Sequence, residues 1–251
     1  LVGAAGDENS YHHNFPAVLD DVVYVHSLTH NTGDDDAEVY SYMNTWNCNN
    51  YGARMTLSAA STACATGAVA QTAGAIGLIK SIGLDNGIDL TAGENYQLLI
   101  NNITDINLSE DERSISKAYP SHEGWDPFYG YGRLNVEAAV AAVVEGRIPP
   151  SISISYPEWF EVIVPDSTPV VDIEATVNAS RTGAFSWTLE VGYGHDPSFT
   201  IVDSGTGGSS FSGVLTTLDV SALPEISIPE AEYDETIRER LARVNEPAVT
   251  V

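Results

Sequence analysis

The stretch Thr62–Ile82, TACATGAVAQTAGAIGLIKSI, decides the fold that we predict for the first half of this 251-residue chain. Its apolar residues recur close to the 3.6-residue period of an α-helix. The recurring positions are Ala65, Val69, Ala73, Ile76 and Ile79. Alanine and glycine fill much of the rest, so neighbouring elements can approach the backbone closely. The pattern predicts a long, central, buried helix.

Strands and further helices alternate around this stretch. The predicted strands are Leu1–Ala5, Val22–Val25 and Arg54–Leu57. A capping box of Thr91 and Glu94 predicts the start of a second helix, and Asn135–Glu145 predicts a third that ends at Gly146. Strands that alternate with helices indicate an α/β domain with a parallel sheet, which we assign to residues 1–148.

The pattern changes at Pro149-Pro150. Ser151–Ser155, Val170–Val177 and Ser186–Val191 alternate polar and apolar residues with turns between them. This pattern predicts an all-β, immunoglobulin-like sandwich over residues 149–251. Because Pro247–Val251 begins another strand at the very end of the sequence, we expect this sandwich to be truncated there.

The balance of charge excludes one class of partners. The chain has 35 Asp and Glu against 10 Lys and Arg, a formal net charge of −25. Duplex nucleic acid and anionic membranes are bound by clusters of Lys and Arg, and the sequence has none, so we predict no nucleic-acid partner. No run of about 18 apolar residues occurs, and we therefore predict no membrane-spanning segment. The acidic composition favours a soluble, secreted protein.

Cys48 and Cys64 are the two cysteines of the chain. No Cys-x-x-Cys, His-x-x-x-His or haem-attachment spacing is present, so we predict no zinc or haem site. Two cysteines in an acidic, exported chain suggest one Cys48–Cys64 disulfide. Two buried free thiols are the alternative.

Five short motifs follow one another along residues 1–148. The chain opens with Leu1–Asp7, LVGAAGD, and Phe15-Pro16-Ala17 precedes the strand at Val22–Val25. Asn50-Tyr51-Gly52 precedes Arg54–Leu57. The last two motifs are Ser61–Ala70, STACATGAVA, and Tyr129–Asn135, YGYGRLN.

In this order the five motifs resemble the C-terminal part of the catalytic domain of the subtilisin-like serine peptidases. Leu1–Asp7 is similar to the family's strand ending Ala-Ala-Gly-Asn, and Ser61–Ala70 is similar to Gly-Thr-Ser-Met-Ala-Thr-Pro-His-Val-Ala. Each motif alone is unspecific, and it is their order that carries the resemblance. The second half is similar to a β-sandwich module that follows some of these peptidases.

The resemblance places Ala63 where the family has its nucleophilic serine and Asp7 where it has the asparagine of the oxyanion hole. Thr62 and Cys64 flank Ala63 at a helix N-terminus, where backbone amides can stabilise an oxyanion. A methyl group cannot attack a carbonyl, and loss of this nucleophile costs about a million-fold in rate. Cys64 lies roughly 100° further round the helix, so it is a poor substitute.

Asp7 departs from the family less decisively. A carboxylate repels a developing negative charge, and loss of one oxyanion-hole donor costs roughly 10²–10³ in rate. Some members of the family carry Asp at this position, so Asp7 alone does not exclude catalysis.

The resemblance also implies that the catalytic Asp and His belong upstream of the Leu1–Ala5 strand. None of the six histidines has the His-Gly-[Thr/Ser] context of the family. Leu1–Ala5 has the pattern of a strand that is buried on both faces and paired on both edges, not of a natural start. We therefore expect either the upstream part of the same peptidase domain or a companion chain, without which residues 1–148 form no stable monomer.

Two functions follow from these observations. The first is a secreted subtilisin-like serine endopeptidase module, with a protein or peptide substrate if active, that is inactive as written because of Ala63 and the absent Asp and His. The alternative is a non-catalytic scaffold for assembly or adhesion, built on a peptidase fold. Both imply an extracellular or cell-surface location. No cofactor is identified, and the family resemblance allows calcium.

Overall fold

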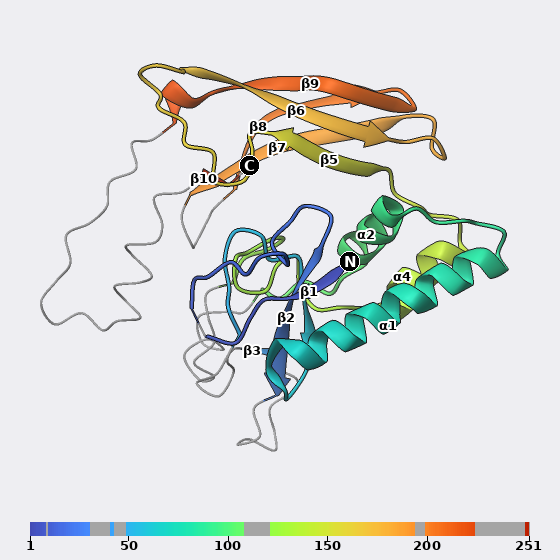
Figure 1. Ribbon diagram of the computed structural model, residues 1–251. Helices are drawn as coiled ribbons and strands as arrows, with labels where there is room; N and C mark the ends of the chain where they lie inside the picture. Colours follow the sequence, from blue (N-terminus) through green and yellow to red (C-terminus); the bar gives the residue numbers. More distant parts are fainter. Residues whose placement is uncertain are drawn as a thin grey trace, which may run out of the picture. The chain divides into compact units, whose positions relative to one another are not determined.

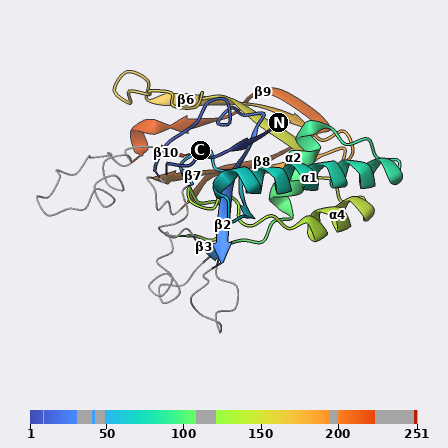
Figure 2. The ribbon, with the colours of Figure 1, turned by 60° about the horizontal axis from the view of Figure 1, so that its bottom comes forward.

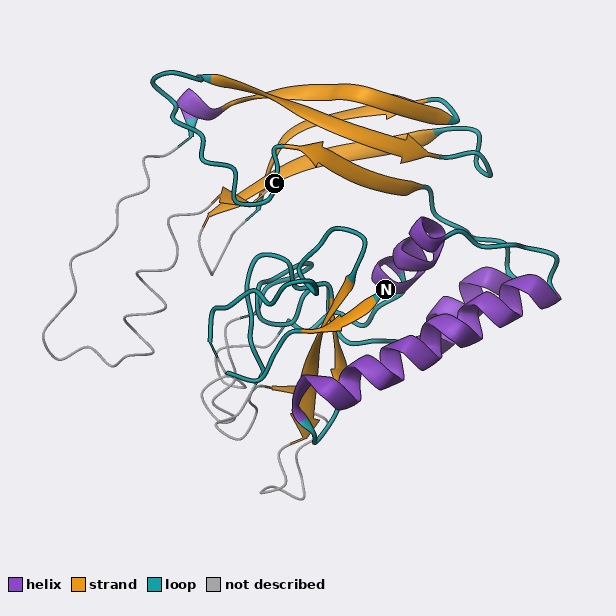
Figure 3. Cartoon of the chain, in the orientation of Figure 1, coloured by secondary structure: helices purple, strands orange, loops and turns teal. Residues whose placement is uncertain are grey.

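The computed structural model describes residues 1–8, 10–30, 41–42, 49–107, 121–193, 199–223 and 249–250. The chain divides into two compact units, of which the first runs from Leu1 to Arg147 and the second begins at Ile148. Within the described residues, all the α-helices belong to the first unit, whereas the second contains strands and one short 3-10 helix (Figure 3).

A small sheet forms the centre of the first unit. Its strands are β1 (Val2–Ala4), β2 (Val23–His30), β3 (Ser41–Tyr42) and β4 (Leu57–Ala60). Both β1 and β4 run parallel to β2, while β3 pairs antiparallel with its end. The predicted α/β architecture with a parallel sheet is therefore present in this unit.

One of the predicted strands is displaced. Arg54–Leu57 was predicted to be extended, but the strand begins only at Leu57 and continues to Ala60. Gly52 has a φ of +147°, and the Met55 amide donates to Gly52 O over 3.1 Å, so the chain turns before Leu57. Glycine adopts this φ without the steric cost that a Cβ would bring.

Helix α1 (Cys64–Asp85) confirms the predicted long helix, but not its burial. Its buried residues form a single stripe: Ala65, Ala68, Thr72, Ala75, Ile79 and Gly83. Ala73 lies outside this stripe and is exposed, and Leu78 is 47% exposed. The pattern predicts a central, buried helix, and in this structure α1 is buried along one side only. Alanine and glycine are short enough to permit burial on any side, so they do not reveal which side is covered.

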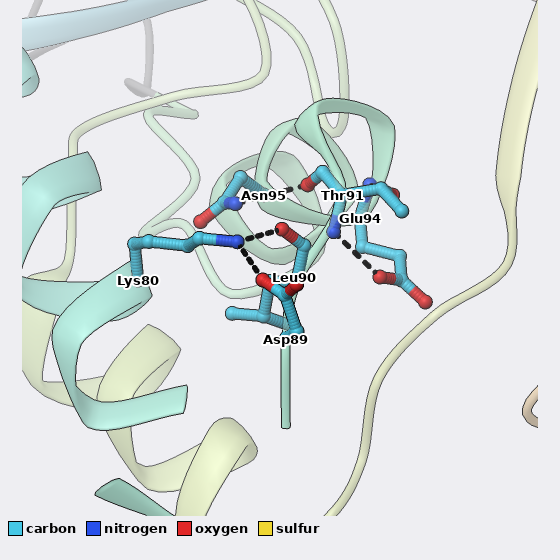
Figure 4. Close-up of polar contacts among 6 residues, drawn as sticks. All are labelled: Lys80, Asp89, Leu90, Thr91, Glu94 and Asn95. Carbon is cyan, nitrogen blue, oxygen red and sulfur yellow. Dashed lines mark hydrogen bonds and ion pairs between the residues drawn. The ribbon is translucent and has the colours of Figure 1, made fainter. Parts of the chain in front are cut away.

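Two shorter helices complete this unit. They are α2 (Ala92–Asn101) and α4 (Val136–Val144), and α4 lies beside α1 in both views (Figures 1 and 2). The predicted capping box is present: the Glu94 amide donates to Thr91 Oγ1 over 3.2 Å, and the Thr91 amide donates to Glu94 Oε2 over 2.8 Å. Lys80 of α1 bonds Asp89 and the Leu90 carbonyl just before this cap, which ties the two helices together (Figure 4).

The closing motif YGYGRLN lies along β4 and is held to it by backbone bonds. The Ser58 amide donates to Gly132 O over 2.8 Å, and the Leu134 amide donates to Ser58 O over 2.8 Å. At Gly130, where φ is +66°, a Cβ would lie 2.5 Å from the backbone of Thr56. This close approach explains why a glycine is needed at that point of the motif.

The second unit contains two three-stranded antiparallel sheets. One has the order β5 (Ser151–Tyr156), β6 (Val170–Asn178), β9 (Ser210–Asp219); the other has the order β10 (Val249–Thr250), β7 (Phe185–Tyr193), β8 (Thr200–Gly207). A 3-10 helix, η1 (Val220–Ala222), follows β9.

Apolar side chains from both sheets share one core. Its buried members are Val171, Ile173, Leu189, Val191, Leu218 and Val220. The strands predicted at Ser151–Ser155, Val170–Val177 and Ser186–Val191 are all present as β5, β6 and β7. The finer assignment, an immunoglobulin-like sandwich, stays a prediction.

Candidate active site

The candidate site lies where β4 leads into α1. Ser61, Thr62 and Ala63 form the connection, and Thr62 and Ala63 are exposed to solvent. Ala63 is the N-cap residue of α1, and no side chain at this position bonds the helix amides. Ala63 takes part in a local hydrogen bond only as a donor, as far as the described residues show: its backbone amide donates to Ser61 Oγ over 3.0 Å. The place that a nucleophile would occupy is therefore open and holds a methyl group.

Cys64, the first residue of α1, has a φ of +48°. This left-handed conformation is uncommon for a residue with a Cβ and costs of the order of 1–3 kcal/mol. Strain of this size is typical of functional sites, where the surrounding structure imposes it. Cys48 lies outside the described residues, so the Cys48–Cys64 disulfide stays a prediction.

Asp7 reaches the same helix terminus from the end of β1. Gly6, with a φ of +99°, turns the chain, and Asp7 Oδ1 then accepts a long hydrogen bond of 3.4 Å from the Ala65 amide. The two residues are 58 positions apart in the sequence. The fold thus brings together Asp7 and the residues beside Ala63, and it sets a carboxylate at the positive end of the α1 dipole.

A buried asparagine fixes the loop that carries Asp7. Asn50 is fully buried, and its Oδ1 accepts from the amides of Glu8 (3.1 Å) and Ser10 (3.4 Å). Its Nδ2 donates to Glu8 Oε2, which also accepts from the Asp7 amide over 3.1 Å. The bond from Asn50 lowers the pKa of Glu8 below its usual value. Asn50 was noted in the sequence only as part of a motif, and Glu8 was missed because nothing local marks its partner.

The side chain of Tyr24 supports the same loop from β2. Its hydroxyl donates to the carbonyl oxygens of Ala5 (3.0 Å) and His12 (3.1 Å). Burial raises the pKa of Tyr24 to about 12, so this phenol stays a neutral donor over the physiological range. Together with Asn50, it holds the chain between β1 and β2 against the sheet.

The described histidines show one serine–histidine pair, and it lies in the core. His26 Nδ1 is 3.3 Å from Ser58 Oγ, and both side chains are 0% exposed. A peptide substrate cannot reach this pair, so it is not a catalytic dyad. His12 is exposed, and burial lowers the pKa of the half-buried His13 to about 4. Nothing is described of the side chain of His30 or of His195.

No group of three His, Cys, Asp or Glu side chains that could hold a metal ion occurs among the described residues. A calcium site therefore stays an expectation from the family resemblance. Of the helices that the structure describes, α1 alone is long and apolar enough, by length and composition, to cross a membrane. A core helix of a soluble protein passes the same test, and α1 packs its buried stripe on β1, β2 and β4.

Comparison with known proteins gives similarity in structure alone. No family model matches the chain, and no curated protein matches it in sequence. Similar solved structures include prenylagaramide maturation protease PagA (15% identity, TM-score 0.39) and patellamide maturation protease PatA (17%, 0.36). Each match covers 57% of this chain and 50% of the other protein.

Tripeptidyl peptidase 2 is also similar, with 15% identity and a TM-score of 0.47 over 99% of this chain and 21% of that protein. These three neighbours are subtilisin-like proteases. The chain spans half the length of the two maturation proteases and about a fifth of tripeptidyl peptidase 2.

Proposed function

We propose that this chain is a module of a secreted subtilisin-like serine endopeptidase that does not cleave peptides itself. The observation that carries the proposal is the open N-terminus of α1, where Ala63 holds the N-cap position and Asp7 Oδ1 meets the Ala65 amide. The helix terminus has backbone amides of the kind that stabilise an oxyanion, of which those of Ala63 and Ala65 are bonded to Ser61 and Asp7, and it lacks the hydroxyl that would create an oxyanion.

The chemistry that a complete site would perform follows from what is present and what is missing. A serine at position 63 would need a histidine to take its proton and an aspartate to orient that histidine. The exposed position of Ala63 leaves room for both to come from the upstream part of the same peptidase domain or from a companion chain. A protein or peptide would then be the substrate, and the family resemblance alone supports calcium as a structural ion.

Two open surfaces support the need for a companion. Strand β1 pairs with β2 alone among the described strands and is only half-buried along its length. The face of α1 away from its buried stripe is exposed, and a Cβ added at Gly74 or Gly77 would meet nothing within 4 Å. A monomer that left both surfaces bare would be prone to aggregate.

Reaction with a serine-directed fluorophosphonate and hydrolysis of casein test the proposal. The wild-type chain should neither label nor cleave. The variant Ala63→Ser should stay inactive alone and gain activity when the upstream segment of the natural protein is added. Turnover by the wild-type chain that the fluorophosphonate blocks would contradict the proposal.

A non-catalytic extracellular scaffold is the second candidate, and the bond between Asp7 and Ala65 favours it. The family resemblance puts Asp7 at the position of the oxyanion-hole asparagine and Ala63 at that of the nucleophile, so both positions differ from those of a working site. If Ala63→Ser and the double variant Ala63→Ser/Asp7→Asn both stay inactive with the upstream segment, the scaffold is the better description. Cell fractionation tests the extracellular or cell-surface location that both candidates share.

A further inference from the structure

The loop between β5 and β6 presents two aromatic residues at the tip of a turn. Trp159 and Phe160 are its central residues, and the turn is closed where the Glu161 amide donates to Glu158 O over 2.9 Å. The two ring centroids are 4.5 Å apart, and the ring planes are inclined by 54°. Trp159 is 37% exposed and Phe160 is 61% exposed. This pair of adjoining rings is therefore displayed at the surface and does not fill the core.

The backbone of Phe160 has a conformation that an aromatic residue rarely adopts. Its φ is +61°, in the left-handed region where the third residue of such a turn is usually Gly or Asn. A Cβ in this region costs stability, and burial does not offset the cost for a side chain that is mostly exposed. Backbone strain of this kind is found at ligand-binding sites, where presentation of a side chain matters more than packing.

The loop is anchored on both sides of this turn. Tyr156 before it and Ile163 after it are half-buried against the core of the second unit. Further along the loop, the amides of Ser167 and Thr168 both donate to Val164 O, over 3.0 Å and 2.9 Å. Because the loop is already ordered, a ligand that binds the turn does not have to order it, and this favours affinity.

The charge around the two rings favours a cationic ligand. Glu158 and Glu161, at the two ends of the turn, are both exposed, and no Lys or Arg occurs between Arg147 and Arg181. A Lys or Arg side chain within about 6 Å of an aromatic ring is attracted by the ring face, and carboxylates beside the ring add to this attraction. A second copy of this chain, with its net charge of −25, is repelled, and so is an anionic membrane.

We propose that the Trp159–Phe160 turn binds a basic, extended segment of another polypeptide. One Arg or Lys side chain of that segment lies against the two rings, and the basic groups next to it pair with the carboxylates of Glu158 and Glu161. The turn belongs to the second unit, and none of its residues takes part in the site at Ala63. Binding at the turn does not depend on catalysis or on its loss at Ala63, so either proposal can fail without the other.

The test uses the full chain, together with the same companion in every sample if the chain needs one to stay soluble. The probe is a dye-labelled peptide, Ser-Gly-Arg-Gly-Arg-Gly-Ser, and its matched control has citrulline in place of both arginines. Citrulline keeps the planar end of the side chain and loses the charge. Fluorescence anisotropy should show that the arginine peptide binds about tenfold or more tightly than the citrulline peptide, and that added salt weakens its binding.

The variant Phe160→Asn separates a binding role from a structural one. Asparagine tolerates the left-handed φ of this position, so the variant should unfold at the same temperature as wild type or at a higher one. It lacks the ring, so its affinity for the arginine peptide should fall about fivefold. A side chain with a structural role would give the opposite result, a lower unfolding temperature and unchanged binding. Val162→Ser alters a residue of the same loop that is 85% exposed, and it should change neither measurement.

A pair of double variants tests the carboxylates at equal change of net charge. Glu158→Gln with Glu161→Gln should weaken binding of the arginine peptide about fivefold at low salt and reduce its salt dependence. Asp172→Asn with Glu174→Gln removes two exposed carboxylates of β6 and leaves the turn intact. This second double variant should bind the peptide as wild type does.

Four outcomes would overturn the proposal. In the first, the folded chain does not bind the arginine peptide, or Phe160→Asn binds it as wild type does. In the second, the citrulline peptide binds equally well, which would make the rings a contact for any planar group. In the third, the chain binds phosphatidylcholine vesicles through Phe160 and does not bind the peptide, which would make the turn a membrane contact. In the fourth, sedimentation shows self-association that Phe160→Asn abolishes, which would make a second copy the occupant.

Discussion

Asp126 and His26 are both buried side chains of the first unit, but their partners lie at very different distances along the chain. Asp126 Oδ1 accepts from the amides of Phe128 (2.8 Å) and Tyr129 (2.7 Å), two and three residues further on. His26 Nδ1 meets Ser58 Oγ, 32 residues away, only because β2 and β4 pair. The comparison shows that a local turn can supply the hydrogen-bond partners of one buried polar group, whereas another buried group obtains its partner only through the tertiary fold.

The two groups are linked through Tyr129 and respond to pH in opposite ways. Ser58 Oγ donates to Tyr129 O over 3.0 Å, so the proton between Ser58 and His26 belongs to His26 Nδ1, and the ring is neutral. Burial lowers the pKa of His26 to about 3. Burial, together with the charge of Asp105, raises the pKa of Asp126 to about 8, although the backbone bonds oppose this shift.

The pH dependence of Asp126 gives the largest expected effect. Its pKa is about 8 in the folded chain and about 3.9 when unfolded, so its stabilising contribution is complete below pH 4 and is lost as pH rises to 8. In urea titrations, wild type should lose about 1.4 kcal/mol per pH unit relative to Asp126→Asn between pH 5 and pH 7. Asparagine keeps the acceptor for both amides, so a constant difference across this range would contradict the assignment.

His26 should give the opposite dependence over a partly overlapping range. Its folded pKa of about 3 lies below the unfolded value of about 6.5, so its contribution is present above pH 6.5 and is lost as pH falls toward 3. As pH falls from 6.5 to 4, the free energy of unfolding of His26→Asn should therefore rise relative to that of wild type. An equal pH profile for the two proteins would show that His26 is not held neutral.

Removal of the link between the two groups should have a smaller effect. Ser58→Ala leaves His26 Nδ1 and the Tyr129 carbonyl without their shared hydroxyl in a buried place, which should cost about 1–3 kcal/mol of unfolding free energy. Ser155 provides a matched control, because its hydroxyl bonds the Glu174 carbonyl from an exposed strand. Chemical denaturation should show almost no loss for Ser155→Ala, and similar losses for both variants would contradict the comparison.

The same contrast explains what the sequence could and could not predict. The Thr91–Glu94 capping box and Gly146, at which α4 ends, act within a few residues, and the local sequence predicts both. The period of Thr62–Ile82 predicted α1, but its buried side is decided by the neighbouring strands. The bonds of Asp7 to Ala65 and of Asn50 to Glu8 join residues 58 and 42 positions apart, and no local pattern marks such pairs.

The N-terminus of α2 tests the local half of the comparison. Thr91→Ala removes the hydroxyl that accepts from the Glu94 amide and should lower the free energy of unfolding by about 1 kcal/mol. Thr91→Ser keeps the hydroxyl and should cost much less. The measurement is thermal or urea unfolding of the full chain. A loss for Thr91→Ser as large as that for Thr91→Ala would show that the methyl group of threonine, not its cap, matters here.

The N-terminus of α1 tests the distant half, and here we expect the smallest effect. Asp7→Ala removes the carboxylate that bonds the Ala65 amide, and because Asp7 is exposed and the bond is 3.4 Å long, the loss should be a few tenths of a kcal/mol. Asp7→Asn keeps an acceptor and loses only the charge, so its deficit should disappear in high salt, where the interaction with the helix dipole is screened. Salt titrations of unfolding for wild type, Asp7→Asn and Asp7→Ala separate the two contributions. A loss for Asp7→Ala that equals the loss for Thr91→Ala would mean that a cap supplied from 58 residues away stabilises a helix as well as a local one, and the comparison would fail at this point.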